Sequence, residues 1–237
     1  MALSVERQVE VGRRSNMEFS GELFPTPWLW CSVALYGWLM TRALRWANWR
    51  RLADADQFNV FLGAVVCVLL LWTLRTEIQP GFSWHLSTMV TLTLMFGWSL
   101  AVIAGSIALL AATLFGLNDW SGLAPTALVF IMLPAALTQV LLGLARAYLP
   151  KHYFVYVFVN AFFAGGVVTV LVALTASGLL LAAGAFALPR LIDNYLLFLP
   201  LMFFPEAVLN GWLISIMVGF KPHWVGSFRD EEYLHGK

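Results

Sequence analysis

His85 is the residue whose type and position most strongly suggest chemistry. It follows the turn residues Pro80 and Gly81, and an apolar run extends from Ser87 to Gly97. Ionisable groups are costly inside membrane segments, so an imidazole at the mouth of a hydrophobic helix is a candidate binding site. The alternative is a structural histidine that only hydrogen-bonds the start of its helix.

Two glutamates in predicted loops could add oxygen ligands to this imidazole. Glu22 and Glu77 are expected on the same membrane face as His85. Imidazole nitrogen suits nickel, cobalt, copper and zinc, whereas carboxylate oxygen suits harder cations. The three side chains would form a partial metal site if they converge, and the two glutamates would otherwise be solvated loop acids.

Glu206 is the second candidate, because it lies about half-way along the last predicted helix. A carboxylate at that depth costs about 2.5–3.5 kcal/mol on insertion scales and needs a partner or a role. Pro205 can open the helix locally, and Asn210 lies one turn further on the same face. We interpret Glu206 and Asn210 as buried polar groups and favour a structural pairing of Glu206, because one carboxylate makes a poor cation cage. Its candidate partners are Arg75, Gln139 and Asn160, the last two also predicted as buried polar groups. A ligand-binding or gating role is the alternative.

The composition defines what positions these side chains. Of the 237 residues 60% are hydrophobic and 11% are charged, with a mean hydropathy of +0.78. Soluble domains carry about 25% charged residues. The apolar runs are continuous rather than alternating, which favours helices over a membrane barrel. The sequence therefore predicts an all-α polytopic membrane protein embedded in a lipid bilayer, and the net charge of +1 gives no reason to expect nucleic acid as a partner.

No motif for catalysis is present in the sequence. It lacks a phosphate-binding loop, a zinc-protease helix and a serine nucleophile elbow, so we expect a non-catalytic protein with no permanently bound cofactor. Cys31 and Cys67 lie within apolar runs and have no zinc-type spacing.

About seven transmembrane helices follow from the apolar runs. The lysines and arginines number nine on one side and five on the other, which favours an outer N-terminus and an inner C-terminus. On this topology His85 lies near the outer face. The predicted helices are 27–46, 58–74, 82–98, 100–117, 125–149, one beginning at 153, and 195–220.

The sixth run, 153–188, is longer than the roughly 20 residues that one crossing needs. We interpret it as one span followed by an interfacial or re-entrant piece, with a hairpin of two spans as the alternative. Residues 1–20 are predicted to be a polar tail, 21–220 the transmembrane domain and 221–237 a short cytoplasmic tail. Met17 is an alternative initiator.

Four stretches together resemble the CbiM/NikM-type cobalt and nickel energy-coupling-factor family. They are PGFSWHLSTMVTLTLMFG (80–97), FVNAFFAGG (158–166), FPEAVLNGWLIS (204–215) and KPHWVGSFRDEEYL (221–234). The resemblance implies the substrate-capture permease of an ABC transporter in the inner cell membrane. Its implied cargo is a divalent transition metal, and its implied partners are a transmembrane coupling protein and two cytoplasmic ATPases.

The N-terminus departs from the family pattern. Family members start with Met-His, and the free amine, that histidine and a later histidine, here His85, bind the metal. This chain begins with Met-Ala, and Glu18 stands at the position of the family histidine if Met17 is the start. Glu18 could supply oxygen instead of nitrogen. A membrane scaffold or partner protein that has lost metal binding is therefore the alternative function.

Overall fold

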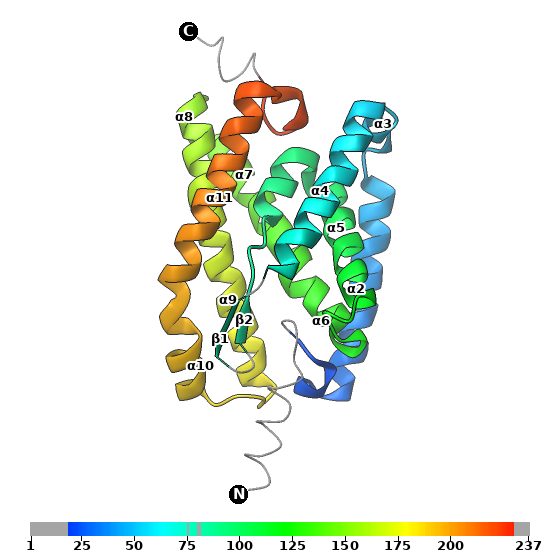
Figure 1. The fold of residues 1–237 in the computed structure, drawn as a ribbon, viewed down its shortest axis with the longest axis vertical. Coiled ribbons are helices and arrows are strands. Elements are labelled where there is room, and N and C mark those ends of the chain that lie inside the picture. Colours follow the sequence, from blue (N-terminus) through cyan, green and yellow to red (C-terminus); the bar gives the residue numbers. More distant parts are fainter. Residues whose placement is uncertain (1–18, 75, 80–81, 230–237) are drawn as a thin grey trace, which may run out of the picture.

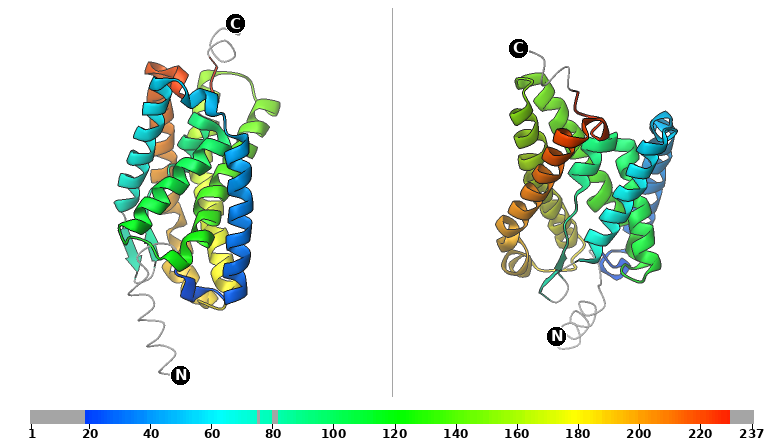
Figure 2. Two further views of the ribbon diagram at one scale, coloured as in Figure 1. Left: turned by 90° about the vertical axis from the view of Figure 1, so that its right-hand side faces the viewer. Right: turned by 45° about the horizontal axis from the view of Figure 1, so that its top comes forward.

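The computed structural model describes residues 19–74, 76–79 and 82–229. The long helices lie side by side in an elongated bundle with two distinct ends (Figure 1). The hairpin end holds the antiparallel strands β1 (Thr76–Gln79) and β2 (Phe82–Trp84). The tail end holds the short helices α3 (Trp49–Leu52) and η6 (Pro222–Trp224). Two further views show the same two-ended arrangement (Figure 2).

The expected all-α polytopic membrane architecture is confirmed. Five helical segments of the described chain are long and apolar enough to cross a membrane: Ala55–Thr73, Met89–Leu114, Trp120–Tyr148, Tyr153–Ala182 and Leu188–Phe220. A sixth long helix, α2 (Thr26–Trp46), matches the first predicted span. It falls outside the apolar set because its tryptophans and arginines lower its hydropathy.

The predicted third helix, 82–98, is wrong in its first half. Residues from Phe82 to Trp84 form a strand and 85–88 are not helical, so helix α5 (Met89–Leu114) begins inside the bundle. It is broken at Gly97, whose φ of 78° and ψ of 170° lie outside the helical region. We call its first part, Met89–Phe96, the half-helix. Its eight residues span about 12 Å, less than half of a bilayer core.

The chain reverses its direction at Gly97. The half-helix runs toward the tail end, where the carbonyls of Leu94 and Met95 accept hydrogen bonds from the chain beyond α11. The remainder of α5 returns to the hairpin end and occupies the place of the predicted fourth helix, 100–117 (Figure 1).

The next segment, predicted as one helix kinked at Pro134, is one continuous helical span with a π-helical turn just before that proline. It comprises α6 (Leu123–Ala127), the π-helix η3 (Leu128–Met132) and α7 (Leu133–Tyr148). Pro134 lies two residues after this π-helical turn, and both a proline and a π-bulge are places where a helix bends.

The long run from residue 153 is one span followed by a short separate helix. Its elements are α8 (Tyr153–Val155), the π-helix η4 (Tyr156–Phe163) and α9 (Ala164–Ala182), followed by α10 (Leu188–Asn194). Because Tyr153–Ala182 is one continuous helical span, the two-span hairpin is wrong, and the interfacial or re-entrant piece stays a prediction. The last helix, α11 (Leu199–Phe220), follows the 3₁₀ turn η5 (Leu196–Phe198).

Close helix contacts place α11 beside the preceding span. A Cβ atom added at Gly166 would lie 2.4 Å from the Phe203 ring, and one at Gly165 would lie 2.9 Å from the Glu206 carbonyl oxygen. Small residues allow such approach where apolar packing alone gives little drive in lipid. This contact fixes the height at which Glu206 faces the interior.

Candidate functional site

A cavity of about 40 Å³ lies in the membrane-spanning part of the bundle, beside the start of the half-helix. Its polar lining comes from four elements or connections: the segment before α5, the span containing α9, the segment before α11, and α11 itself. The polar lining residues are His85, Ser87, Thr169, Tyr195 and Glu206. The two leading sequence candidates, His85 and Glu206, are thus brought to one cavity although 120 residues separate them.

His85 is buried, with 7% of its surface exposed. Its ring meets the Trp72 ring edge-on, with centroids 5.4 Å apart. The indole Nε1 of Trp72 donates a hydrogen bond of 3.3 Å to the Ser87 carbonyl, so one tryptophan contacts both His85 and the strand-to-helix connection. The imidazole is therefore held at the cavity by packing rather than left at an exposed helix mouth.

Glu206 and Asn210 bind the beginning of the half-helix. The Ser87 N–H donates to Glu206 Oε1, and the Asn210 side-chain N–H₂ donates to Glu206 Oε2 at 2.8 Å. Asn210 Oδ1 accepts from the Thr91 N–H at 2.9 Å and from the Thr91 hydroxyl at 2.7 Å. The first N–H groups of a helix have no partner within it, and α11 supplies acceptors for them.

This arrangement explains how a carboxylate is accommodated at that depth. Both Glu206 oxygens accept hydrogen bonds, and they face the N-terminal end of the half-helix, where the helix dipole favours negative charge. Of the partners predicted for it, Arg75 lies outside the described residues. Within the described part of the chain, Glu206 is bound by Ser87 and Asn210 rather than by Gln139 or Asn160.

Of the other sequence candidates, Glu22 and Asn160 do not line this cavity. Glu22 is exposed on the 3₁₀ turn η1 (Gly21–Leu23). Glu18 and the side chain of Glu77 lie outside what the structure describes. Asn160 is buried as predicted, on η4, and its Oδ1 accepts no hydrogen bond from the described residues.

Gln139 was wrongly predicted as a buried group, because it lies on an exposed face of α7. Within the described residues no three His, Cys, Asp or Glu side chains are grouped as a metal site. His85 is therefore the one predicted ligand that the described structure places at the cavity.

The first described residue is anchored next to the same cavity. Phe19 is 1% exposed, and its ring lies 5.2 Å from that of Phe130, a cavity-lining residue. Ser20 donates to Asp119 at 3.1 Å, and the Gly21 N–H donates to the Ser121 hydroxyl at 3.1 Å. The chain therefore enters the bundle beside the His85 cavity.

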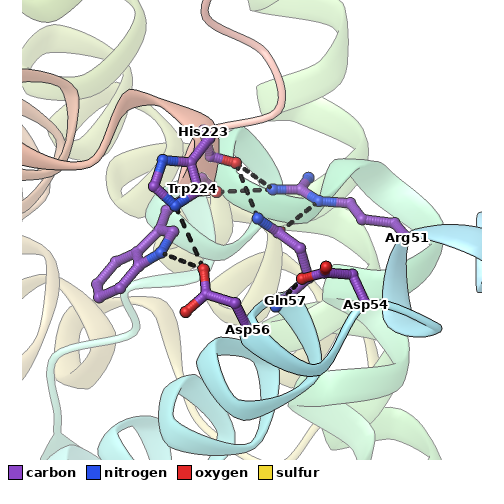
Figure 3. Close-up of polar contacts among 6 residues, drawn as sticks. All are labelled: Arg51, Asp54, Asp56, Gln57, His223 and Trp224. Carbon is purple, nitrogen blue, oxygen red and sulfur yellow. Dashed lines mark hydrogen bonds and ion pairs between the residues drawn. The ribbon is translucent and has the colours of Figure 1, made fainter.

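A second set of polar contacts joins the tail end of the half-helix to two other segments, and sequence reasoning missed it. Arg51 donates to the carbonyls of Met95 and, at 2.8 Å, Trp224, and its Nε donates to Gln57 Oε1 at 2.8 Å. Asp56 accepts from the Trp224 indole at 3.2 Å and lies 3.3 Å from His223 Nε2. Figure 3 shows the Arg51 guanidinium pointing toward the backbone of His223 and Trp224. Burial lowers the pKa of Arg51, which nonetheless stays charged.

The opposite side of the half-helix faces a larger apolar groove of about 480 Å³. Its walls are α4 (Ala55–Thr73) and α11, represented by Ala64 and Leu213 among others, and Thr91 and Leu92 of the half-helix also line it. The half-helix therefore separates a small polar cavity from a wide apolar groove.

These features define a polytopic membrane protein with a histidine-containing cavity at the start of a broken helix. Residues 19–224 match the model of the CbiM family, which is described as the cobalt uptake substrate-specific transmembrane region. Because this match covers most of the 237 residues, the chain belongs to the CbiM family. No curated protein and no solved structure gives a significant match to the chain.

Proposed function

We propose that this protein is the substrate-capture permease of an energy-coupling-factor type ABC transporter that imports a divalent transition metal ion. The family match supports cobalt as the cargo, and we include nickel in the proposal as a second candidate ion. The observation that carries the proposal is the buried His85 imidazole at a small cavity within the membrane-spanning bundle. Imidazole is a favourable ligand for both ions.

The hairpin end is the proposed side of capture. The arginine and lysine distribution favours this end as the outer face, and His85 follows the β1–β2 hairpin there. Glu18 and Glu77 are proposed as additional oxygen ligands, because the chain enters beside the cavity and β1 leads into the His85 segment. Such ligands would favour a different balance of metals than an all-nitrogen set.

In this proposal ATP is hydrolysed by partner proteins and not by this chain. The chain has no nucleotide-binding motif, so separate cytoplasmic ATPases would hydrolyse ATP and a transmembrane coupling protein would link them to this subunit in the inner cell membrane. The protein itself would be non-catalytic, and its metal would be cargo rather than a resident cofactor.

Metal content tests the proposal. Detergent-purified protein started at Met1 or at Met17 would be loaded with cobalt, nickel, copper or zinc and analysed by mass spectrometry after removal of free metal. We expect a stoichiometric ion in at least one form, and we expect His85→Ala to lose most of it while remaining folded, because the imidazole is the central ligand.

His152→Ala is the matched control. His152 lies at the opposite end of the bundle, where its Nδ1 accepts one hydrogen bond of 3.2 Å from the Phe154 N–H. Metal retained equally by both variants would remove His85 from the site. No metal in either start form would contradict capture and favour the scaffold function, for which the Glu18 replacement is the supporting observation.

A further inference from the structure

One helix and the residues directly after it hold both ends of the half-helix. At the first end, Glu206 and Asn210 of α11 accept the N–H groups of Ser87 and Thr91. At the other end, the Gly226 N–H donates to the Met95 carbonyl at 2.9 Å. The Leu94 carbonyl accepts from the Ser227 N–H at 3.1 Å and from its hydroxyl at 2.7 Å. The half-helix is thus fixed relative to α11 at both of its ends.

The contacts at the tail end satisfy carbonyls that the chain break would leave without partners. Because Gly97 is not helical, the last carbonyls of the half-helix have no N–H one turn ahead. Arg51 reaches the Met95 carbonyl from α3, and the same guanidinium binds the carbonyls of Trp224 and His223. Arg51 therefore joins three segments that are far apart in the sequence.

The half-helix is bounded by two residues with positive φ angles. Thr88 has φ 51°, which is unusual for a β-branched residue, and Gly97 has φ 78°. The cavity lies along one side of the segment and the apolar groove along another. A short rigid helix with a backbone change at each end and unfilled space beside it depends on its end contacts for its position.

We infer that the half-helix is the positioning element of the His85 site and that Arg51 sets its position from the tail end. His85 lies three residues before Thr88, so a displacement of the half-helix moves the imidazole relative to the cavity. Arg51, Glu206 and Asn210 are positioning residues. The inference rests on the proposed function only for the statement that His85 binds metal, and the mechanical connection stands without it.

Two variants remove the tail-end contacts in different ways. Arg51→Gln removes the guanidinium. Gly226→Ala keeps the charge but places a Cβ atom 2.3 Å from Arg51 Nη1 and 2.9 Å from the Met95 carbonyl oxygen, so it separates the two groups. The matched controls are Arg50→Gln, an exposed neighbouring arginine, and Gly219→Ala, where an added Cβ meets nothing within 4 Å.

The full-length chain in detergent would be examined by hydrogen exchange and by titration with Co²⁺ alone. Both variants are expected to speed amide exchange of residues 87–92 by about five-fold or more, with α9 unchanged, because the half-helix opens more often. They are also expected to weaken Co²⁺ binding by about ten-fold, and the controls are expected to match the wild type.

The exchange rates and the Co²⁺ affinities together distinguish failure of the inference from failure of the proposed function. The inference is overturned if residues 87–92 exchange no faster in Arg51→Gln and Gly226→Ala than in the control variants. Faster exchange with unchanged Co²⁺ affinity also overturns it, because His85 would then be positioned independently of the half-helix. A wild-type protein that binds no Co²⁺ contradicts the proposed function instead, and the exchange measurement then decides the mechanical connection by itself.

Discussion

Helices α2 and α5 show how differently two apolar segments are used in one bundle. Helix α2 is continuous over 21 residues, and Ala43 is its one buried residue. Helix α5 is broken at Gly97, yet 19 of its 26 residues are buried. The intact helix α2 therefore lies at the periphery of the bundle, and the interrupted helix α5 lies in its interior.

The difference follows from how backbone groups are satisfied in a membrane. A lipid-facing segment must pair its N–H and C=O groups within itself, which requires an unbroken helix. The half-helix can stop within the bundle because α11, Arg51 and the chain after α11 supply partners for its ends. The interrupted segment is also the one that lines the His85 cavity, so the break and the candidate site occur together.

Replacing Asn210 by leucine is expected to have the largest effect on this comparison. The change leaves the Thr91 N–H and hydroxyl without an acceptor and removes a donor from Glu206. Each buried group that loses its partner costs about 1–3 kcal/mol, so a total loss of about 3 kcal/mol or more is expected. Thermal unfolding in detergent would measure it.

Asn59→Leu is the control, because Asn59 is exposed on the intact helix α4. A variant of Asn210 as stable as the Asn59 variant would show that α11 does not support the start of the half-helix.

A pair of glycine substitutions tests the break itself. Gly97→Ala meets no steric obstacle but puts a side chain at φ 78° and ψ 170°, a region occupied almost only by glycine, which costs about 1–3 kcal/mol. Gly37→Ala lies within the continuous helix α2, also in open space, and is expected to be neutral or to stabilise by up to about 1 kcal/mol. Unfolding midpoints measured side by side should move in opposite directions. Equal shifts would mean that Gly97 is not needed for the reversal of the chain.

A change at Asp119, which lies outside both α2 and the half-helix, should have the smallest effect. Hydrogen bonds lower the pKa of Asp119 below its ordinary value of 3.8. The Ser121 hydroxyl has the largest effect, and the Ser121 N–H, the Ser20 hydroxyl and the Gly21 N–H add to it. A carboxylate with a lowered pKa stabilises the fold above its unfolded pKa and loses this contribution as the pH falls through its folded pKa.

Asp119→Asn should therefore destabilise the protein by less than about 1 kcal/mol near neutral pH, since the group is largely exposed. The difference from wild type should shrink between roughly pH 6 and pH 3. A difference that stays constant over this range would show that ionisation of Asp119 contributes nothing to anchoring the N-terminal segment.

The sequence by itself predicted the class of the protein, most of its helices and its leading candidate residues. Low charge and continuous apolar runs leave helices as the favoured membrane structure, so α2, α4 and α11 were located to within a few residues. His85 and Glu206 stood out because titratable groups are costly in such surroundings. These inferences depend on local composition, which a sequence contains directly.

The tertiary structure alone decided where the third predicted helix begins and what its ends contact. The predicted helices 82–98 and 100–117 already had their boundary beside Gly97, but the apolar run gave no sign that the first of them begins only at Met89. The start of the half-helix is supported by Glu206 and Asn210, which accept the Ser87 and Thr91 N–H groups from 119 residues away along the chain. Gln139 was misplaced for a related reason, since polarity does not reveal which face of α7 is covered. Contacts between distant segments decide which backbone and side-chain groups are satisfied, and a single sequence does not contain those contacts in readable form.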